Sequence, residues 1–277
     1  MNIEKWMMVL AAASLAAWSC GPRKADAPRV LVLYYSQTSN TKAVADEIAT
    51  RLGADTEEIV AVNPYDGDFQ ATIGRCLQER EAGVLPEINP IDANLADYDV
   101  IFLGYPVWFG TFAPPVITLL GQVDLAGKKV VPFCTFGSGG LESSIADLKA
   151  RQPEADILAG YGVRAARIDA VPAEVDRFLK EIGLLEGKVE KLEEFPEQHP
   201  VSDEEAAVFD AAVAGYPMLD AKASAVAIRN TPWGVEYQFA ALPNVREGRP
   251  DMPPAVEMTV YVLVEEGKTP VFTRVVR

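Results

Sequence analysis

The sequence contains few of the residues on which several common kinds of site are built. Among its 277 residues are three cysteines and one histidine, too few for a disulfide scaffold or a histidine-rich metal site. Basic residues are outnumbered by acidic ones, 25 to 40, and the net charge of −15 argues against attraction to nucleic acid or anionic lipid. The hydrophobic fraction of 49% is nevertheless that of a globular protein, and the length favours two domains.

The uncharged run at the N-terminus is too short to cross a membrane. It extends from Trp6 to Ser19, 14 residues, whereas a spanning helix needs about 20. This length is typical of a signal peptide, which we place at residues 1–19. The small residue before Cys20 resembles the lipobox of bacterial lipoproteins, which implies a lipid on Cys20 and a tether at residues 20–28. The alternative is ordinary secretion, in which Cys20 has no special role.

Both alternatives predict an exported protein. Lipidation further predicts that it is anchored in a membrane, on the periplasmic side or at the cell surface. Outside the cytoplasm disulfides are permitted, and after processing only Cys76 and Cys134 would remain to form one. Cys134 lies in an apolar strand segment and Cys76 in an expected helix, and the sequence gives no reason to place them within bridging distance. We therefore expect two buried free thiols.

From residue 29 to residue 185, apolar segments of strand length alternate with segments of helix length. Some of these strand segments are apolar throughout, which is typical of strands covered on both faces. The alternation predicts an α/β domain with a five-stranded parallel sheet and helices on both faces. We expect strands at 29–35, 57–62, 100–103, 129–135 and 157–163, and helices at 41–52, 69–81, after Pro114 and Pro115, at 142–149 and at 172–183. Ligands of such sheets bind beyond the carboxyl ends of the strands.

The first of three unusual loops follows the first expected strand and precedes a helix. Hydroxyl groups and the backbone N–H groups of a helix N-terminus can together bind a phosphate without a formal positive charge. The loop lacks the Gly-Lys-Ser/Thr of a Walker motif, and the alternative is a capped turn, which the same residue types favour. Its residues are Ser36, Gln37, Thr38, Ser39, Asn40 and Thr41.

The second loop follows the third expected strand and is rich in aromatic residues. Aromatic side chains at such a strand end suit stacking on a planar ring, and Trp108 is the best candidate. The alternative is packing of the aromatics on the core, which we expect for Phe112. The candidate ligand-binding residues are Tyr105, Pro106, Val107, Trp108, Phe109 and Gly110.

The third loop follows the fourth expected strand and contains three glycines in four residues. Glycine allows the backbone to approach a ligand closely, although a flexible turn would have the same composition. The loop is not the dinucleotide-binding Gly-x-Gly-x-x-Gly, because Glu142 stands where the last glycine would be. Its candidate residues are Thr135, Phe136, Gly137, Ser138, Gly139 and Gly140.

In order and spacing, the three loops together resemble those of the flavodoxins. The first is similar to that family's phosphate loop, except that Ser39 stands where many members have glycine. The second is similar to the loop with the flavin-stacking aromatic, and the third to the last loop that contacts the ring. The resemblance implies a flavodoxin-like domain at residues 29–185 that binds FMN, with the phosphate on residues 36–41 and the ring between the other two loops. Gly110 is then the candidate for a backbone contact to the flavin N5.

Three functions are compatible with this resemblance. The first is electron transfer by a carrier whose acidic surface docks a redox partner protein with a basic face. The second is an FMN-dependent reductase that passes hydride from NAD(P)H to a quinone or a similar acceptor, and the third is a flavodoxin-shaped binding domain without redox activity. We expect the carrier, because soluble nicotinamide cofactors are scarce outside the cytoplasm, and we assign no catalytic residue.

The remainder of the chain has a different pattern. Residues 186–202 are rich in glutamate and predict a linker. Residues 203–277 predict a small α+β domain, with a helix at 203–214 and an antiparallel sheet of strands at 223–229, 234–241, 255–264 and 271–276. We see no catalytic constellation in this domain and no resemblance to a family, and we expect Trp233 to be a turn residue folded onto the sheet. Of the net charge, −4 falls on residues 203–277 and −11 on residues 1–202.

Overall fold

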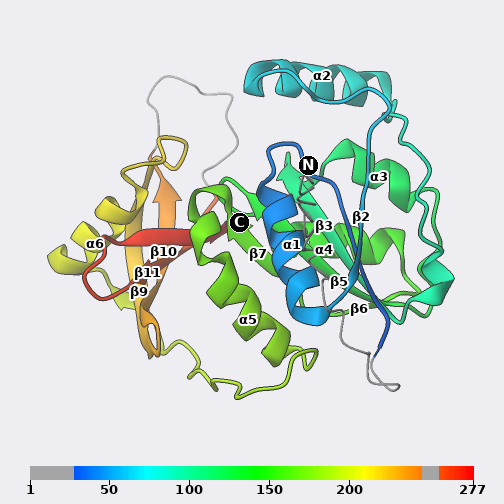
Figure 1. Ribbon diagram of the computed structural model, residues 1–277. Helices are drawn as coiled ribbons and strands as arrows, with labels where there is room; N and C mark the ends of the chain where they lie inside the picture. Colours follow the sequence, from blue (N-terminus) through cyan, green and yellow to red (C-terminus); the bar gives the residue numbers. More distant parts are fainter. Residues whose placement is uncertain (1–27, 245–255) are drawn as a thin grey trace, which may run out of the picture.

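The computed structural model describes residues 28–244 and 256–277. The predicted signal peptide, Cys20 and nearly all of the predicted tether lie outside the described residues. Within the described part of the chain, no helix is long and apolar enough to cross a membrane. Two sheets are present, and Figure 1 shows helices on both faces of the first and a single helix beside the second.

The first sheet contains five parallel strand positions, as predicted. Its order reverses between β1 and β3, so the crevice at their carboxyl ends is the position where such sheets bind ligands. The strands, in spatial order, are β2 (Asp55–Glu58), β1 (Val30–Tyr34), β3 (Val100–Trp108), β5 (Lys129–Phe136) and a last strand in two pieces, β6 (Asp156–Ile157) and β7 (Tyr161–Arg164).

Helices cover both faces of this sheet, which explains why its central strands are apolar throughout. Along β1, Leu31 and Leu33 belong to one core cluster, while Val30, Val32 and Tyr34 belong to the other. The first cluster includes side chains of α2 (Phe69–Ala82), α3 (Pro114–Leu120) and α4 (Leu141–Arg151), and the second includes side chains of α1 (Asn40–Leu52) and α5 (Val171–Glu181). Short 3-10 helices lie at Leu95–Asp97 and Ala165–Ala170. The predicted α/β architecture is therefore confirmed.

The structure differs from the sequence-based expectation at the end of the third strand. We expected a strand at 100–103, but β3 continues to Trp108 and turns back into β4 (Thr111–Phe112). The two turn residues, Phe109 with φ 52° and Gly110 with φ 84°, both have the left-handed backbone of the tight turns that suit β-hairpins. The predicted second loop is therefore partly a short hairpin.

The last strand is interrupted where one residue is inserted. Val130 pairs with Ile157, whereas Phe133 pairs with Tyr161, so three steps along β5 match four steps along the outer strand. Pro132 lies within this stretch of β5 and has no N–H to donate to a ladder. The predicted single strand at 157–163 is consequently divided into β6 and β7.

The second domain is α+β with an antiparallel sheet, as predicted. Its helix α6 (Asp203–Val213) begins with a capping box between Ser202 and Glu205, and its buried Phe209 packs edge-on against Phe239 of the sheet, with 5.2 Å between the ring centroids. The strands, in spatial order, are β12 (Val271–Val276), β11 (Met258–Val264), β10 (Gly234–Pro243), β9 (Ala221–Thr231) and β8 (His199–Pro200). The strand β8 falls within the predicted linker, so the end of that segment belongs to the second sheet.

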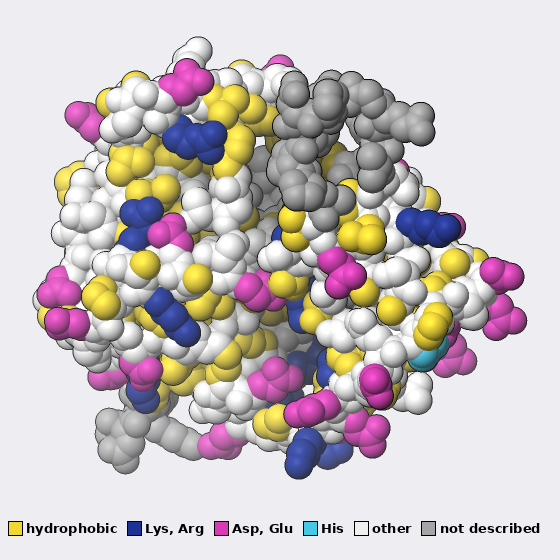
Figure 2. All heavy atoms as spheres, turned by 180° about the vertical axis from the view of Figure 1, so that it is seen from behind, with side chains coloured by type: hydrophobic (Ala, Val, Ile, Leu, Met, Phe, Trp, Pro, Cys, Tyr) yellow, Lys and Arg dark blue, Asp and Glu magenta, His cyan; other side chains and the backbone are white. Residues whose placement is uncertain are grey.

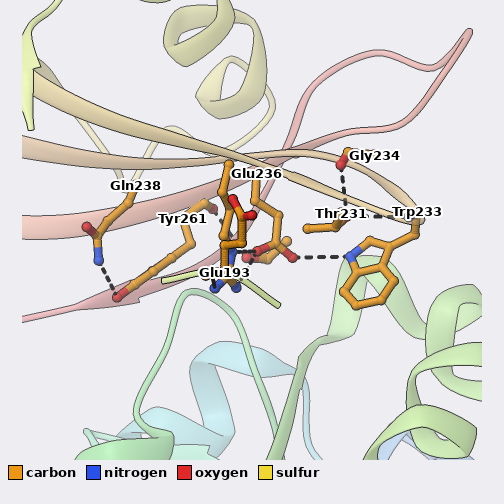
Figure 3. A network of polar contacts seen from close by, with 9 residues as sticks. Glu193, Thr231, Trp233, Gly234, Glu236, Gln238 and Tyr261 are labelled. Atoms are coloured by element: carbon orange, nitrogen blue, oxygen red, sulfur yellow. Dashed lines mark hydrogen bonds and ion pairs between the residues drawn. The ribbon is translucent and has the colours of Figure 1, made fainter. Parts of the chain in front are cut away.

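A polar network ties the linker and a turn to the second sheet (Figure 3). Arg229 donates to Glu236 at 2.6 Å and to the carbonyl of Glu193 at 3.0 Å. The indole N–H of Trp233 donates to the same Glu236 at 3.1 Å, and the Arg177 guanidinium of α5 lies 4.1 Å from the indole ring centroid. Trp233 is thus folded onto its sheet, as predicted, and also contacts the first domain.

Candidate functional site

All three predicted loops start at the same end of the first sheet. They follow β1, β3 and β5, which are adjacent strands in the order β1-β3-β5. Parallel strands present their carboxyl ends at one edge, so the loops are brought to the crevice where the strand order reverses.

The first loop presents hydroxyl groups at the N-terminus of α1. Ser39 is the N-cap residue, with φ 65°, and its side chain makes no capping hydrogen bond. Glycine adopts this left-handed backbone without strain. In this chain Ser39 adopts the same conformation. Ser36 Oγ accepts from the N–H of Lys42 at 3.2 Å, and Asn40 donates to Thr38 Oγ1 at 3.2 Å. The loop therefore has the donors that an anion requires at a helix end.

Two side chains anchor the first loop within the first domain. The Thr41 hydroxyl is buried and lies 2.8 Å from the hydroxyl of Thr135 at the end of β5. Gln37 donates to the carbonyl of Tyr65 at 2.9 Å and to Thr72 Oγ1 of α2 at 2.8 Å. The loop is thus held between β5 and α2.

The aromatic residues of the second loop divide between the core and the site. Trp108 is half-buried and makes edge contacts with Tyr35 and Tyr65, at centroid distances of 6.0 and 5.2 Å. Phe109 is 55% exposed. Phe112 is buried, which confirms the prediction for it, and packs edge-on against Tyr105.

Tyr105 belongs to the core although the prediction places it among the ligand-binding residues. Its side chain is fully buried, and its hydroxyl lies 2.9 Å from Ser144 Oγ of α4. Burial raises the pKa of the Tyr105 hydroxyl well above its ordinary value. Its neighbours Pro106, Thr135 and Phe136 belong to the ends of β3 and β5.

The glycines of the third loop make room for the second domain. The Ser138 carbonyl accepts from the N–H of Val275 at 2.6 Å. A Cβ on Gly139 would lie 2.1 Å from the Val275 carbonyl oxygen, and one on Gly137 would lie 2.8 Å from the Tyr216 hydroxyl. We predicted that these glycines let the backbone approach a ligand closely; at these two positions the structure shows a close approach to the second domain.

A cavity of about 580 Å³ joins the second and third loops, a volume typical of small-molecule sites. The predicted residues in its lining are Gln37, Val107, Trp108, Phe109, Gly110, Gly137, Ser138, Gly139 and Gly140. Ser36, Thr38, Ser39, Asn40 and Thr41 lie outside this lining, at the start of α1. The structure therefore brings residues 107–110 and 137–140 together around one cavity, leaves Tyr105, Pro106, Thr135 and Phe136 outside its lining, and places the phosphate-binding candidates at a helix end.

Besides Glu142 and Ser143 in the first turn of α4, sequence reasoning missed two larger parts of the cavity wall. One is the face of α2 formed by Phe69, Thr72, Ile73 and Cys76, whose spacing of three, four and seven residues marks one side of a helix. The other comes from the second domain and consists of Tyr216, Met218, Val275, Val276 and Arg277. The helical spacing was available in the sequence, but no local signal indicates that the end of β12 reaches the first domain.

The two described cysteines are free and buried, as predicted. Burial raises the pKa of the Cys76 thiol to about 11, so Cys76 is protonated at neutral pH although it lines the cavity. Among residues 28–244 and 256–277, no group of three or more His, Cys, Asp or Glu side chains is arranged to hold a metal ion.

Comparisons with known proteins identify a family for the first domain. A family model described as Flavodoxin matches residues 29–171, just over half of the chain. Among solved structures, a protein named as a flavoprotein from Bacteroides eggerthii is 28% identical, with 56% of this chain and 98% of that chain covered and a TM-score of 0.48. A flavoprotein in complex with FMN from Lactobacillus acidophilus is 25% identical, with 54% and 99% covered and a TM-score of 0.45. The assignment of the chain to a family rests on the family model, which does not extend to the second domain.

Proposed function

The chain belongs to the flavodoxin family, and from that premise we propose that it binds FMN and acts in electron transfer. The observation that carries this proposal is the cavity at the carboxyl ends of β3 and β5, whose lining includes Trp108 and the glycines of the third loop. A large aromatic side chain and closely approaching backbone are the features that a planar ring requires.

The residues of the first loop fit the phosphate of FMN. The hydroxyls of Ser36, Thr38 and Ser39, the amide of Asn40 and the N-terminus of α1 form a set of neutral donors, and such donors at a helix N-terminus stabilise a dianion. Gln37 belongs to this loop and also lines the cavity. The proposed phosphate site and the proposed ring site are therefore adjacent.

The residues around the cavity would bind and orient the ring. We propose that Trp108 stacks on it, and that Gly110, with φ 84°, offers a backbone group to the flavin N5. When bound, FMN supplies the capacity to accept and donate electrons, and the protein tunes that capacity through stacking, hydrogen bonds and nearby charge. The acidic surface of the chain disfavours added negative charge on a bound group.

We further propose that the protein is exported and held at a membrane by a lipid on Cys20, with a partner protein of basic character. The net charge of −15 supports electrostatic steering of such a partner. On the face seen in Figure 2, acidic side chains are spread widely over the surface. A basic partner would therefore be attracted by the summed field of the molecule.

One observation favours a second candidate, an FMN-dependent reductase of a quinone or similar acceptor. The cavity is bounded by both domains and has exposed apolar side chains at Phe69, Phe109 and Met218, which suit a small planar reactant beside the flavin. Steady-state oxidation of NAD(P)H by the FMN-loaded protein, with a quinone present, distinguishes the two candidates: turnover supports the reductase, and its absence supports the carrier.

The visible absorption spectrum of the purified protein, followed by titration with FMN, tests the proposal itself. We expect bound flavin at a ratio of one per chain, weaker binding in Trp108→Ala and Thr38→Ala, and unchanged binding in Phe195→Ala, the control, which packs against Tyr261 outside the cavity lining. A colourless protein that takes up no FMN would overturn the proposal and favour a binding domain without redox activity.

A further inference from the structure

The cavity has a wall that lies outside the part of the chain matched by the family model. That match ends at residue 171, whereas Tyr216, Met218 and the end of β12 line the cavity. We propose that the second domain is an integral part of the flavin-ring site: the edge of β12 fixes the third loop, and residues 216–218 and 275–277 form a wall against which the ring is bound. This inference rests on the proposed FMN binding.

The contact between the two domains is made through the outer edge of β12. Among residues 28–244 and 256–277 this strand lies at the edge of its sheet, so its outward backbone groups face no neighbouring strand in that part of the chain. The N–H of Val275 donates to the Ser138 carbonyl at 2.6 Å, and the carbonyl of Phe272 accepts from Arg164 at 3.1 Å. An exposed edge would invite pairing with other chains. Here the first domain takes up both groups, and in Figure 1 β12 extends toward β7.

Arg164, at the end of β7, joins the third loop to the second domain. Its guanidinium donates from Nε to the Gly137 carbonyl at 2.8 Å and from Nη1 to Phe272, and it lies 3.4 Å from the centroid of the Phe272 ring. The residue is only 8% exposed. One buried cation thus holds a carbonyl of each domain, and hydrogen bonds to a charged donor are stronger than those between neutral groups.

The third loop is closely packed against β12. Any side chain at Gly139 would meet the Val275 carbonyl oxygen at 2.1 Å, and one at Gly140 would meet a methyl group of Val107 at 2.5 Å. The loop is therefore confined between the hairpin of the second loop and the edge of the second sheet. Because interiors packed at this density change in discrete steps, the loop conformation depends on the position of the second domain.

The wall contributed by the second domain has the chemistry of a ring-binding surface. Met218 is 76% exposed, and exposed methionine is flexible and polarizable enough to adapt to an aromatic surface. Tyr216 adds an aromatic ring, and Val276 an aliphatic surface. Together with the exposed rings of Phe69 and Phe109, these residues give the cavity an apolar surface, while Glu142 and Arg277 add charged groups to its lining; a mostly apolar lining with a few polar groups is typical of sites for small organic ligands.

FMN titration of the full chain, followed by flavin fluorescence, tests this inference with two variants, each with a control. Met218→Asp places a charge on the cavity wall at an exposed position, where the fold tolerates it. Val256→Asp, at a position 64% exposed in the second domain and outside the cavity lining, is the control with the same charge. Val275→Pro removes the N–H that reaches Ser138, on the outward side of an edge strand, where the ladder does not need this donor. Because the Val275 side chain is buried, the same measurement on Val275→Ala separates loss of the N–H from loss of packing.

We expect Met218→Asp to raise the FMN dissociation constant at least fivefold and Val256→Asp to change it by less than twofold. In Val275→Pro, we expect iodide to quench the fluorescence of bound flavin more strongly than in the unmodified protein, because the third loop is released. If the two aspartate variants bind FMN equally and iodide quenching is unchanged, the inference is wrong while FMN binding stands. If the unmodified protein binds no FMN, both proposals are wrong. Circular dichroism shows whether each variant is folded.

Discussion

The first and third loops leave the same edge of one sheet, yet they are held by different parts of the chain. The first is anchored inside the α/β domain, by Thr41 to Thr135 and by Gln37 to α2. The third is anchored partly by the second domain, through the N–H of Val275, and partly by Arg164 of the first domain, which also donates to Phe272 of the second domain. A phosphate site can therefore be built by the first domain alone, whereas the geometry of a ring site depends on both domains.

The largest effect is expected from breaking the link between the domains. Arg164→Met keeps much of the side-chain volume but removes the donors to two carbonyls. We expect a loss of about 3 kcal/mol in the free energy of unfolding, because hydrogen bonds to charged groups contribute about 1.5–3 kcal/mol each. Urea denaturation followed by circular dichroism measures it.

A matched control and a conservative variant make the Arg164 prediction sharper. Arg51 pairs with Glu47 and Asp176 inside the first domain and is partly exposed, so Arg51→Met should cost about 1 kcal/mol or less. Arg164→Lys should fall between, because lysine keeps the charge but cannot donate to both carbonyls in the same planar geometry. Equal losses for Arg164→Met and Arg51→Met would mean that the link between the domains contributes no more to the free energy of unfolding than an ion pair within one domain.

A smaller effect is expected from the anchor of the first loop. Thr41→Val removes one partner of the buried hydroxyl pair and leaves Thr135 without it, at a cost of about 1–2 kcal/mol in the free energy of unfolding. The double variant with Thr135→Val should lose less than the sum of the two single variants, because neither hydroxyl is then left unpaired. If the losses simply add, the hydroxyl pair does not anchor the loop.

FMN binding gives a second way to distinguish the support of the first loop from that of the third loop. Thr41→Val should weaken FMN binding without changing iodide quenching of the bound flavin, because the phosphate end is disturbed and the second domain is not. The opposite pattern, with increased quenching and unchanged affinity, would show that the two loops do not have the separate supports described above.

The smallest effect concerns the thiol in the cavity. Because burial raises the pKa of Cys76 from an ordinary 9.0 to about 11, little of the reactive thiolate is present at neutral pH. The rate of Cys76 alkylation by iodoacetamide should therefore rise about tenfold per pH unit and level off near pH 11. Mass mapping of the Cys76 peptide measures the rate.

Bound FMN should slow this alkylation at every pH, because Cys76 lines the cavity. Cys134 is fully buried in the sheet and lies outside the lining, so its low reactivity should not depend on FMN. Alkylation of Cys76 that is equally fast with and without FMN would place the ligand elsewhere.

Much of the first domain could be predicted because its signals are local. The apolar run of β1 is buried on both faces, and Ser, Thr and Asn mark the turn into α1. Tyr105 shows where this reasoning fails. Counting aromatic residues in a loop cannot tell which of them lie inward. The strand β3 continues past Leu103. Tyr105 is two residues further along it and therefore faces the same core as Leu103.

The contribution of the second domain to the site could not be predicted, although its helix and strands could. The strands follow from alternating patterns and turn residues, which depend on neighbours in sequence. The docking of β12 depends on contacts between residues more than 100 positions apart, such as Arg164 with Phe272. The glycines at 137 and 139 do record this contact, but a close approach to protein and a close approach to ligand have the same signature in a sequence.

Hydrogen exchange of the full chain with and without FMN shows whether both domains form the ring site. We expect slower exchange on FMN binding in peptides covering residues 36–41, 105–110 and 137–140, and also in the peptide covering 271–277 of the second domain. Protection confined to the first domain would contradict the two-domain ring site, and no protection in any of these peptides would contradict FMN binding at this cavity.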